Sequence, residues 1–408
     1  MIKECFVTLS FILIWTSAIS QTINETDRGI TGQELGDDLN PVNSAVPFLT
    51  IAPDSRAGAM GDVGVATSPD ANSMHWNPAK FAFLENDLGI SLSYTPWLRK
   101  LVNDIDLVYL TGYKSFRQKQ ALGFSLYYFS LGEITFTNAR GEVIRPGNPN
   151  EFSLDAAYSR LLSNNYSMGV SFRYIHSNLS GGAPVEGTDT RAGNAVAFDV
   201  SGYYTNNFRM ERKPANIGIG FNLSNIGSKI SYTEITESFL PMNMRLGSAL
   251  EVELDDYNSL TFALDFNKLM VPTTPVYYPD STDENGDPVL LFGKGDLNAS
   301  VPVAIFSSFY DAPGVMENGK RKVWREELRE VTIGFGVEYW YAKQFAIRGG
   351  YFHEHETKGN RKYFSLGIGL KLNVFGLDVS YLIPRNFNNA LANTIRFSLL
   401  FNFEPEKR

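Results

Sequence analysis

Three evenly spaced glycines raise the first chemical question in this sequence. They are Gly58, Gly61 and Gly64, within "GAMGDVGVATSPDANSMHWNPAKFAFLEN". Their spacing is G-x-x-G-x-x-G, whereas a dinucleotide-binding turn uses G-x-G-x-x-G and a P-loop ends in Lys followed by Ser or Thr. No alternation of strand and helix patterns surrounds them. The glycines therefore do not predict a phosphate-binding loop, and no cofactor is expected.

The other candidates for catalysis or metal binding lack partners at the required spacing. His353 and His355 in "FHEHE" share one strand face, but no third metal ligand is identifiable. The acidic stretch "DSTDENGD" departs from the ligand spacing of an EF-hand loop. His176 and Ser177 are adjacent, so a strand would point them to opposite sides. We predict no metal site and no enzymatic activity.

Composition and the first residues narrow the class of protein. The 408 residues carry a net charge of −8 with no basic cluster, so nucleic acid is not expected as a partner. Residues 1–20, "MIKECFVTLSFILIWTSAIS", show a basic start, a short apolar run and small residues at a cleavage site, which predicts a secretory signal peptide. The only cysteine, Cys5, lies inside it. After Ser20 no apolar run approaches the roughly twenty residues that a membrane helix needs.

From Asp87 onward, large apolar residues alternate with small or polar ones, which predicts β-strands. In "FSLGIGLKL" (364–372), for example, the apolar residues share one face, and the serine, glycines and lysine share the other. About fourteen such segments approach the ~10-residue length of a membrane strand. They are 88–97, 104–115, 120–136, 151–163, 166–177, 195–207, 216–224, 243–254, 258–269, 330–342, 344–353, 361–372, 374–384 and 393–403.

Nearly every charge in these segments shares the face of the small residues. A basic side chain facing lipid at the bilayer midplane costs roughly 2–4 kcal/mol. A soluble β-sandwich would also alternate, but glycine has no evident use on a water-facing surface. We therefore predict an all-β fold, a closed antiparallel 14-stranded transmembrane β-barrel over 87–403 with a polar lumen. Paired lumen charges would leave little conductance; the candidates are Arg173, Asp199, Arg245, Asp265, Glu338, Arg348, Asp378 and Arg396.

The connections between the segments alternate long and short, as expected for extracellular loops and periplasmic turns. An even number of strands places both barrel ends in the periplasm, with 404–408 as a short tail. The longest connection, 270–329, contains the apolar stretch "VPVAIFSSFY". It predicts either a partner-binding surface or a lid over the barrel itself, and both roles can coexist. The candidate partner-binding residues are Val301, Ile305, Phe306, Phe309, Tyr310 and Trp324.

The segment 21–86 precedes the first strand and is rich in residues that favour local turns. Glycines on the inward strand faces would leave room for it. We predict that it is an N-terminal periplasmic segment and hatch, plugging the lumen near the periplasmic side. The candidate plug residues are Asp54, Arg56, Gly58, Gly61, Asp62, Gly64, Asp70, Asn77 and Pro78.

The stretch "AVPFLTIAPDSRAGAMGDVGVATSPDANSMHWNPAKFAFLEN" resembles the N-terminal signature of the PorV family, outer-membrane barrels of type IX secretion in the Bacteroidota. That family is similar to the FadL-like fourteen-stranded transport barrels, whose hatch also carries an Asn-Pro-Ala element, here Asn77, Pro78 and Ala79. Ser55 stands where alanine is common, and Lys80 stands where many FadL-like barrels have glycine.

This resemblance implies a function that composition cannot show. It implies residence among the lipids and lipopolysaccharide of the cell outer membrane, and a link to gliding motility. The expected partners are the very large translocon barrel of type IX secretion, the C-terminal domains of secreted cargo, and the surface attachment complex to which cargo is delivered. The alternative is a FadL-like transporter of hydrophobic small molecules.

Overall fold

The computed structural model describes residues 39–100, 102–116, 119–137, 140, 142–179, 190–234, 236–283, 288–317, 319–385 and 394–403. The expected signal peptide (1–20), the start of the expected periplasmic segment (21–38) and the expected tail (404–408) lie outside the described residues. No helix in the described ranges has the length and apolarity needed to cross a membrane.

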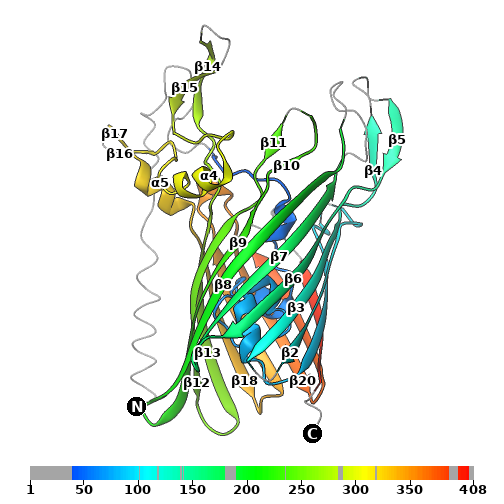
Figure 1. Ribbon diagram of the computed structural model, residues 1–408, viewed down its shortest axis with the longest axis vertical. Helices are drawn as coiled ribbons and strands as arrows, with labels where there is room; N and C mark the ends of the chain where they lie inside the picture. The colour runs from blue at the N-terminus through cyan, green and yellow to red at the C-terminus, as the bar shows by residue number, and fades with distance from the viewer. Residues whose placement is uncertain are drawn as a thin grey trace. The chain divides into compact units, whose positions relative to one another are not determined.

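Fourteen antiparallel strands form one closed barrel (Figure 1), which confirms the predicted fold class. The first strand closes the barrel by pairing with the last, with Leu88 opposite Phe403. The barrel strands are β1 (Leu88–Pro96), β2 (Asp106–Phe116), β3 (Gln120–Ser130), β6 (Asn150–Leu161), β7 (Tyr166–Asn178), β8 (Gly193–Met210), β9 (Lys213–Gly227), β12 (Asn243–Glu253), β13 (Asn258–Leu269), β18 (Thr332–Tyr341), β19 (Phe345–His353), β20 (Lys362–Leu372), β21 (Phe375–Pro384) and β22 (Ile395–Phe403).

The alternation of residue types determines which face of each strand points outward. In β3, Leu122, Phe124 and Leu126 are exposed on the outer wall, whereas Ser125 and Tyr127 between and after them are buried in the lumen. Because successive side chains of a strand point to opposite faces, one slip in register would bring the whole polar set to the lipid side. The sequence pattern thus fixes a barrel with an apolar outside.

The connections at one end are short, and those at the other carry additional structure (Figure 1). The long-loop end holds four hairpins, β4–β5 (Ile134–Thr137, Val143–Gly147), β10–β11 (Ile230–Ser231, Glu237–Ser238), β14–β15 (Val276–Thr282, Pro288–Phe292) and β16–β17 (Val315–Glu317, Lys320–Lys322). It also holds helices α4 (Val301–Ser307) and α5 (Val323–Arg329) and a 3-10 turn, η3 (Glu356–Lys358).

One predicted strand is shorter than expected. The pattern over 120–136 predicts a continuous strand, but β3 ends at Ser130 and β4 begins a separate hairpin at Ile134. Gly132 adopts a positive φ of 78° between them, a conformation that a strand residue does not take. A glycine thus breaks the alternating run where the chain leaves the barrel wall.

The chain from Leu39 to Asn86, called the inner segment, runs through the barrel interior (Figure 1). It contains the short elements η1 (Pro47–Thr50), α2 (Ser55–Gly58), α3 (Ser73–Trp76) and η2 (Pro78–Phe83). At the long-loop end, the Asn40 amide donates to the Thr357 carbonyl (2.8 Å). The segment then crosses to the short-turn end, where β1 begins. The inner segment therefore extends between the two ends of the lumen, and the position of a plug near the periplasmic side stays a prediction.

Candidate functional site: the occupied lumen and the cap

Inward-facing glycines of the barrel leave space for the backbone of the inner segment. A Cβ on Gly336 would lie 2.6 Å from the Met60 carbonyl oxygen, and one on Gly169 would lie 2.7 Å from the Ala79 nitrogen. These separations are too short for non-bonded atoms, so a side chain at either position would displace the segment. These inward-facing glycines therefore let the backbone of the inner segment pack directly against the barrel strands.

The three glycines near the start of the chain form contacts with the wall. Gly61 has a positive φ of 71°, and its amide donates to Ser365 Oγ (2.9 Å). The amides of Gly64 and Val65 donate to one carboxylate oxygen of Asp265, at 2.8 and 3.0 Å. Consecutive amides of this kind bind anions. Here the anion is a carboxylate of the barrel itself, not a phosphate.

A buried ion network connects the inner segment to β18, β19 and β21. Arg56 donates two hydrogen bonds to Glu338, at 3.0 and 2.7 Å, and also pairs with Asp70 (2.9 Å). Arg348 donates to the same Glu338 (2.6 Å) and to Asp378 (2.5 Å). One carboxylate thus joins an arginine of the segment to an arginine of the wall.

A second network lies at a bulge between β8 and β9. Their register shifts between Phe198 and Val200, and Asn225 opposite adopts a φ of 61°. The Asn225 amide donates to Asp199 (2.8 Å). Arg173 pairs with Asp155 (2.6 Å) and Asp199 (3.1 Å). At this bulge, Asp199 therefore accepts hydrogen bonds both from the backbone amide of Asn225 and from the guanidinium group of Arg173.

Three further plug candidates fix the shape of the inner segment. Asp54 accepts from the Ala57 amide (2.9 Å), which caps α2, and from Trp76 Nε1 (2.6 Å). Asn77 Nδ2 donates to the carbonyls of Val65 (2.9 Å) and Gly202 (3.0 Å). Pro78 occupies the first turn of η2, where its fixed φ suits a helical start.

Lys80, which the sequence marked only as a departure from the FadL-like pattern, has a structural role inside the lumen. Its ammonium group is buried and donates to the Gly64 carbonyl (2.7 Å) and to Thr67 Oγ1 (3.3 Å). It thereby ties the glycine-containing loop to η2. A glycine at this position could not make that bond.

Two of the remaining predicted residues, Asp62 and Arg245, line one cavity. Arg396 is 3.9 Å from Asp62, and Gly58 packs against the Arg396 side chain. Arg245 donates to Asn267 (2.5 Å) and lies 4.4 Å over the Trp76 ring, but among the described residues it forms no ion pair. The sequence indicated that lumen charges can pair with each other or with the plug; within the described residues Arg245 forms no such pair.

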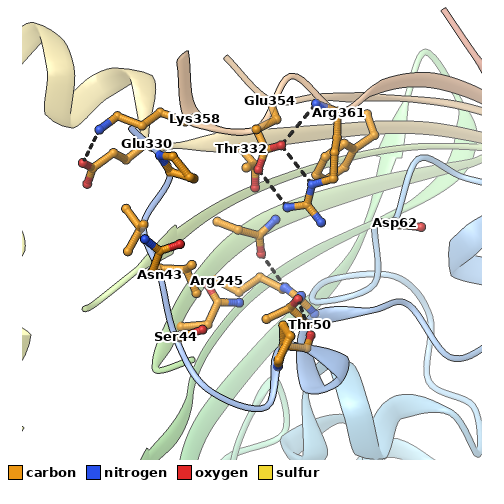
Figure 2. A pocket seen from close by; sticks show the side chains of 18 of the residues that line it. Asn43, Ser44, Thr50, Asp62, Arg245, Glu330, Thr332, Glu354, Lys358 and Arg361 are labelled. Carbon is orange, nitrogen blue, oxygen red and sulfur yellow. Dashed lines mark hydrogen bonds and ion pairs between the residues drawn. The ribbon is translucent and has the colours of Figure 1, made fainter. Parts of the chain in front are cut away.

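The cavity has a volume of about 390 Å³ and lies between the first part of the inner segment and the wall (Figure 2). Figure 2 shows Arg245, Thr50 and Ser44 on one side of this space and Glu330, Thr332, Glu354 and Arg361 on the other. Most lining side chains are polar or charged. A lining of this kind suits a hydrated or polar occupant better than a hydrocarbon.

The described part of the connection from Met270 to Val331, called the cap, is anchored to the barrel by buried ion pairs. Lys268 at the end of β13 donates to Glu327 (2.9 Å) and Glu330 (2.5 Å). Lys358 in η3 donates to Glu326 (2.7 Å) and Glu330 (3.1 Å). Helix α5 is therefore held against the end of the barrel by Glu326 and Glu327 within it and by Glu330 directly after it.

Charged groups also lie within the cap. Asp311 is buried and accepts a hydrogen bond from the Thr273 amide (3.3 Å). Burial, together with the nearby carboxylates of Glu327 and Glu330, raises the pKa of Asp311 to about 6. Burial also raises the pKa of Glu327, opposed by Lys268. The cap therefore contains one acid, Asp311, whose pKa lies well above that of an exposed aspartate.

The six predicted partner-binding residues divide between two faces of the cap. Val301 and Ile305 pack inward against a cluster around Met270. Phe306 and Trp324 are 71% and 59% exposed, and Phe309 and Tyr310 are exposed as well. Val303 on α4 and Leu328 on α5 are also exposed, although they were not predicted. The helical spacing of Val303 to Phe306, and of Trp324 to Leu328, was the signal that could have found them.

The histidines weighed as metal ligands lie at the rim. His355 caps η3 by accepting a hydrogen bond from the Thr357 amide (3.2 Å), and His353 ends β19. Within the described ranges, no group of three potential metal-ligating side chains comes together. His355 thus has a structural role in the β19–β20 connection.

These features define an outer-membrane β-barrel protein with an occupied lumen and a structured cap. The chain matches the family described as type IX secretion system protein PorV over residues 35–276, more than half of its length. It belongs to the PorV family, as its N-terminal signature predicted. It is an outer-membrane component of type IX secretion.

The solved structures to which this chain is similar are distant in sequence. The Ralstonia pickettii toluene transporter TbuX is 11% identical, with a TM-score of 0.48 over 87% of this chain and 98% of that one. The CymD monoaromatic hydrocarbon channel is 13% identical, with a TM-score of 0.44 over 87% and 98%. The Pseudomonas putida toluene transporter TodX is 10% identical, with a TM-score of 0.44 over 89% and 98%. No curated protein sequence gives a significant match.

Proposed function

We propose that this protein is a non-enzymatic docking component of type IX secretion, whose cap binds the translocon and the C-terminal domains of cargo and passes cargo to the surface attachment complex. The observation that carries this proposal is the set of exposed apolar side chains on α4 and α5, beyond the ends of the barrel strands. Family membership supports the secretion system as the setting.

Lipid accounts for apolar exposure on the barrel wall but not on the cap. Phe306, Tyr310, Trp324 and Leu328 belong to the long connection after β13, where side chains face water or a partner. Clustered apolar exposure outside the membrane is typical of a protein interaction surface. Aromatic residues are also enriched among those that contribute most to binding energy.

The buried ion pairs favour a rigid docking surface. Because Lys268 and Lys358 hold the carboxylates of α5, the helix does not need to become ordered when a partner binds. A surface that is already ordered loses less entropy on association. The inward face, with Val301 and Ile305, covers the rim at the same time, so the lid and docking roles coexist.

The occupied lumen supports a role in which cargo does not pass through this barrel. The inner segment fills the interior from the long-loop end to the short-turn end, and buried arginines tie it to the wall. We therefore expect little conductance. The polar cavity gives no specific support to transport of hydrophobic small molecules, so we do not favour that alternative.

Affinity purification from outer membranes tests the docking role. The variant Phe306→Ser/Trp324→Ser/Leu328→Ser removes three exposed side chains, and Val143→Ser is the matched control, since Val143 is 69% exposed on the separate hairpin β4–β5. Loss of one central interface side chain weakens the binding free energy by about 2 kcal/mol. Capture of translocon and cargo should therefore fall by about 30-fold or more in the triple variant. Capture unchanged from the control, with equal barrel abundance, would contradict the proposal.

A further inference from the structure

The lumen arginines differ in how closely carboxylates surround them. Arg56, Arg173 and Arg348 each contact two carboxylates at 3.1 Å or less, and Arg396 lies 3.9 Å from Asp62. Arg245 is only 8% exposed, yet within the described ranges it makes no ion pair. A buried guanidinium group without a carboxylate partner is costly, because desolvation is not repaid by a close anion.

The neighbours of Arg245 do not supply the missing anion at close range. Asn267 accepts one hydrogen bond from its Nε, and the Trp76 ring lies beneath the guanidinium plane. Asp265 and Asp62 act on it only through space, and one carboxylate oxygen of Asp265 accepts hydrogen bonds from the amides of Gly64 and Val65. The remaining edge of the guanidinium group can therefore take a ligand.

The other charges around the cavity already have partners. Lys358 pairs with Glu326 and Glu330, and Arg361 pairs with Glu354 (2.8 Å). Asp62 accepts a hydrogen bond from the Tyr363 hydroxyl. Among the charged residues that line the cavity, Arg245 is thus distinguished by having no charged partner in the described structure.

The geometry points to a binding site for a small polar organic anion in this cavity, with Arg245 pairing with its carboxylate or phosphate group. The volume of about 390 Å³ falls within the usual range of small-molecule sites. Asn43, Ser44, Asn243 and Thr332 add hydrogen-bonding side chains to the lining, which suits a ligand with hydroxyl groups. This inference is independent of partner binding by the cap.

Thermal shift and calorimetric titration of the full-length protein in detergent test the site. The probes are glucuronate, glucose 6-phosphate and, as the uncharged control, glucose. We expect at least one of the two anions to bind and to raise the melting temperature at millimolar concentration, while glucose does neither. Arg245→Met should weaken that binding by about tenfold or more, since a close charge pair is lost.

A second variant separates loss of the site from loss of folding. Thr50→Trp fills the cavity beside Arg245 while keeping the guanidinium group, so it should also abolish anion binding. The carboxylate and phosphate probes distinguish the two possible anionic groups. Failure of both anions to bind the unaltered protein would overturn the inference, and so would equal binding by the unaltered protein and a folded Arg245→Met or Thr50→Trp variant.

Discussion

The substitution Glu338→Gln removes the charge that joins the inner segment to the barrel wall. Glu338 is buried on β18 and accepts two hydrogen bonds from Arg56 and one from Arg348, all between 2.6 and 3.0 Å. Glutamine keeps the size and one acceptor oxygen but loses the negative charge. Each arginine retains one carboxylate, Asp70 for Arg56 and Asp378 for Arg348.

The carboxylates that remain beside the two arginines determine how much stability Glu338→Gln removes. Removal of one member of a buried ion pair costs about 3–5 kcal/mol when the other charge is left unpaired. Since both arginines keep a partner, we expect the lower end, a loss of about 3 kcal/mol in the free energy of unfolding. The orientation of the inner segment should also loosen, because Arg56 would then be held mainly by a residue of its own segment.

Equilibrium unfolding by guanidinium in lipid vesicles, followed by tryptophan fluorescence, measures this loss. The control is Glu317→Gln, whose ion pairs with Lys322 and Arg325 are exposed to solvent, so that its loss should cost far less stability than the loss of Glu338. Bilayer conductance, measured in parallel, should rise only in Glu338→Gln. A cost for Glu338→Gln no larger than that of the control would refute the assigned role of the network.

Three further predictions follow from packing, chain path and ionisation. Gly350→Ala should destabilise the barrel by about 1–3 kcal/mol because its Cβ would lie 2.6 Å from Met60 Cα, whereas Gly349→Ala, with no contact closer than 3.8 Å, should cost little by the same unfolding assay. The orientation can be tested in a Cys5→Ser background with a membrane-impermeant maleimide added to intact cells. The reagent should label Leu39→Cys, which is 66% exposed at the long-loop end, and should not label Tyr257→Cys, which is 65% exposed in a short turn. The reverse labelling pattern would exclude the assigned orientation. Because the pKa of Asp311 is raised, the folded cap binds a proton more tightly than the unfolded chain does, and the stability of the cap should fall as pH rises from about 4 through about 6. Hydrogen exchange in the cap should show this fall in the native protein but not in Asp311→Asn.

The strand pattern was predictable because lipid and lumen impose opposite demands on alternate residues. Within a hairpin, the register then gives ion pairs directly: Asp155 lies opposite Arg173, and Glu338 lies opposite Arg348. The short turns fix the register of each hairpin, so these ion pairs can be derived from the sequence once the turns are placed.

Contacts between distant parts of the chain could not be derived in this way. The pairing of Arg56 with Glu338 spans 282 residues and depends on how the inner segment is threaded through the closed barrel. Helix α4 is only seven residues long, with Pro302 in its first turn, so its stability depends on packing rather than on intrinsic propensity. Such features depend on tertiary context, which local patterns do not encode.

The location of secreted cargo in cells that lack this chain tests the secretion role most directly. Cargo carrying the type IX C-terminal domain should accumulate in the periplasm of the deletion strain, return to the surface with the native chain, and remain inside with the triple cap variant at equal barrel abundance. Normal display of cargo on the surface of the deletion strain would contradict the proposed role.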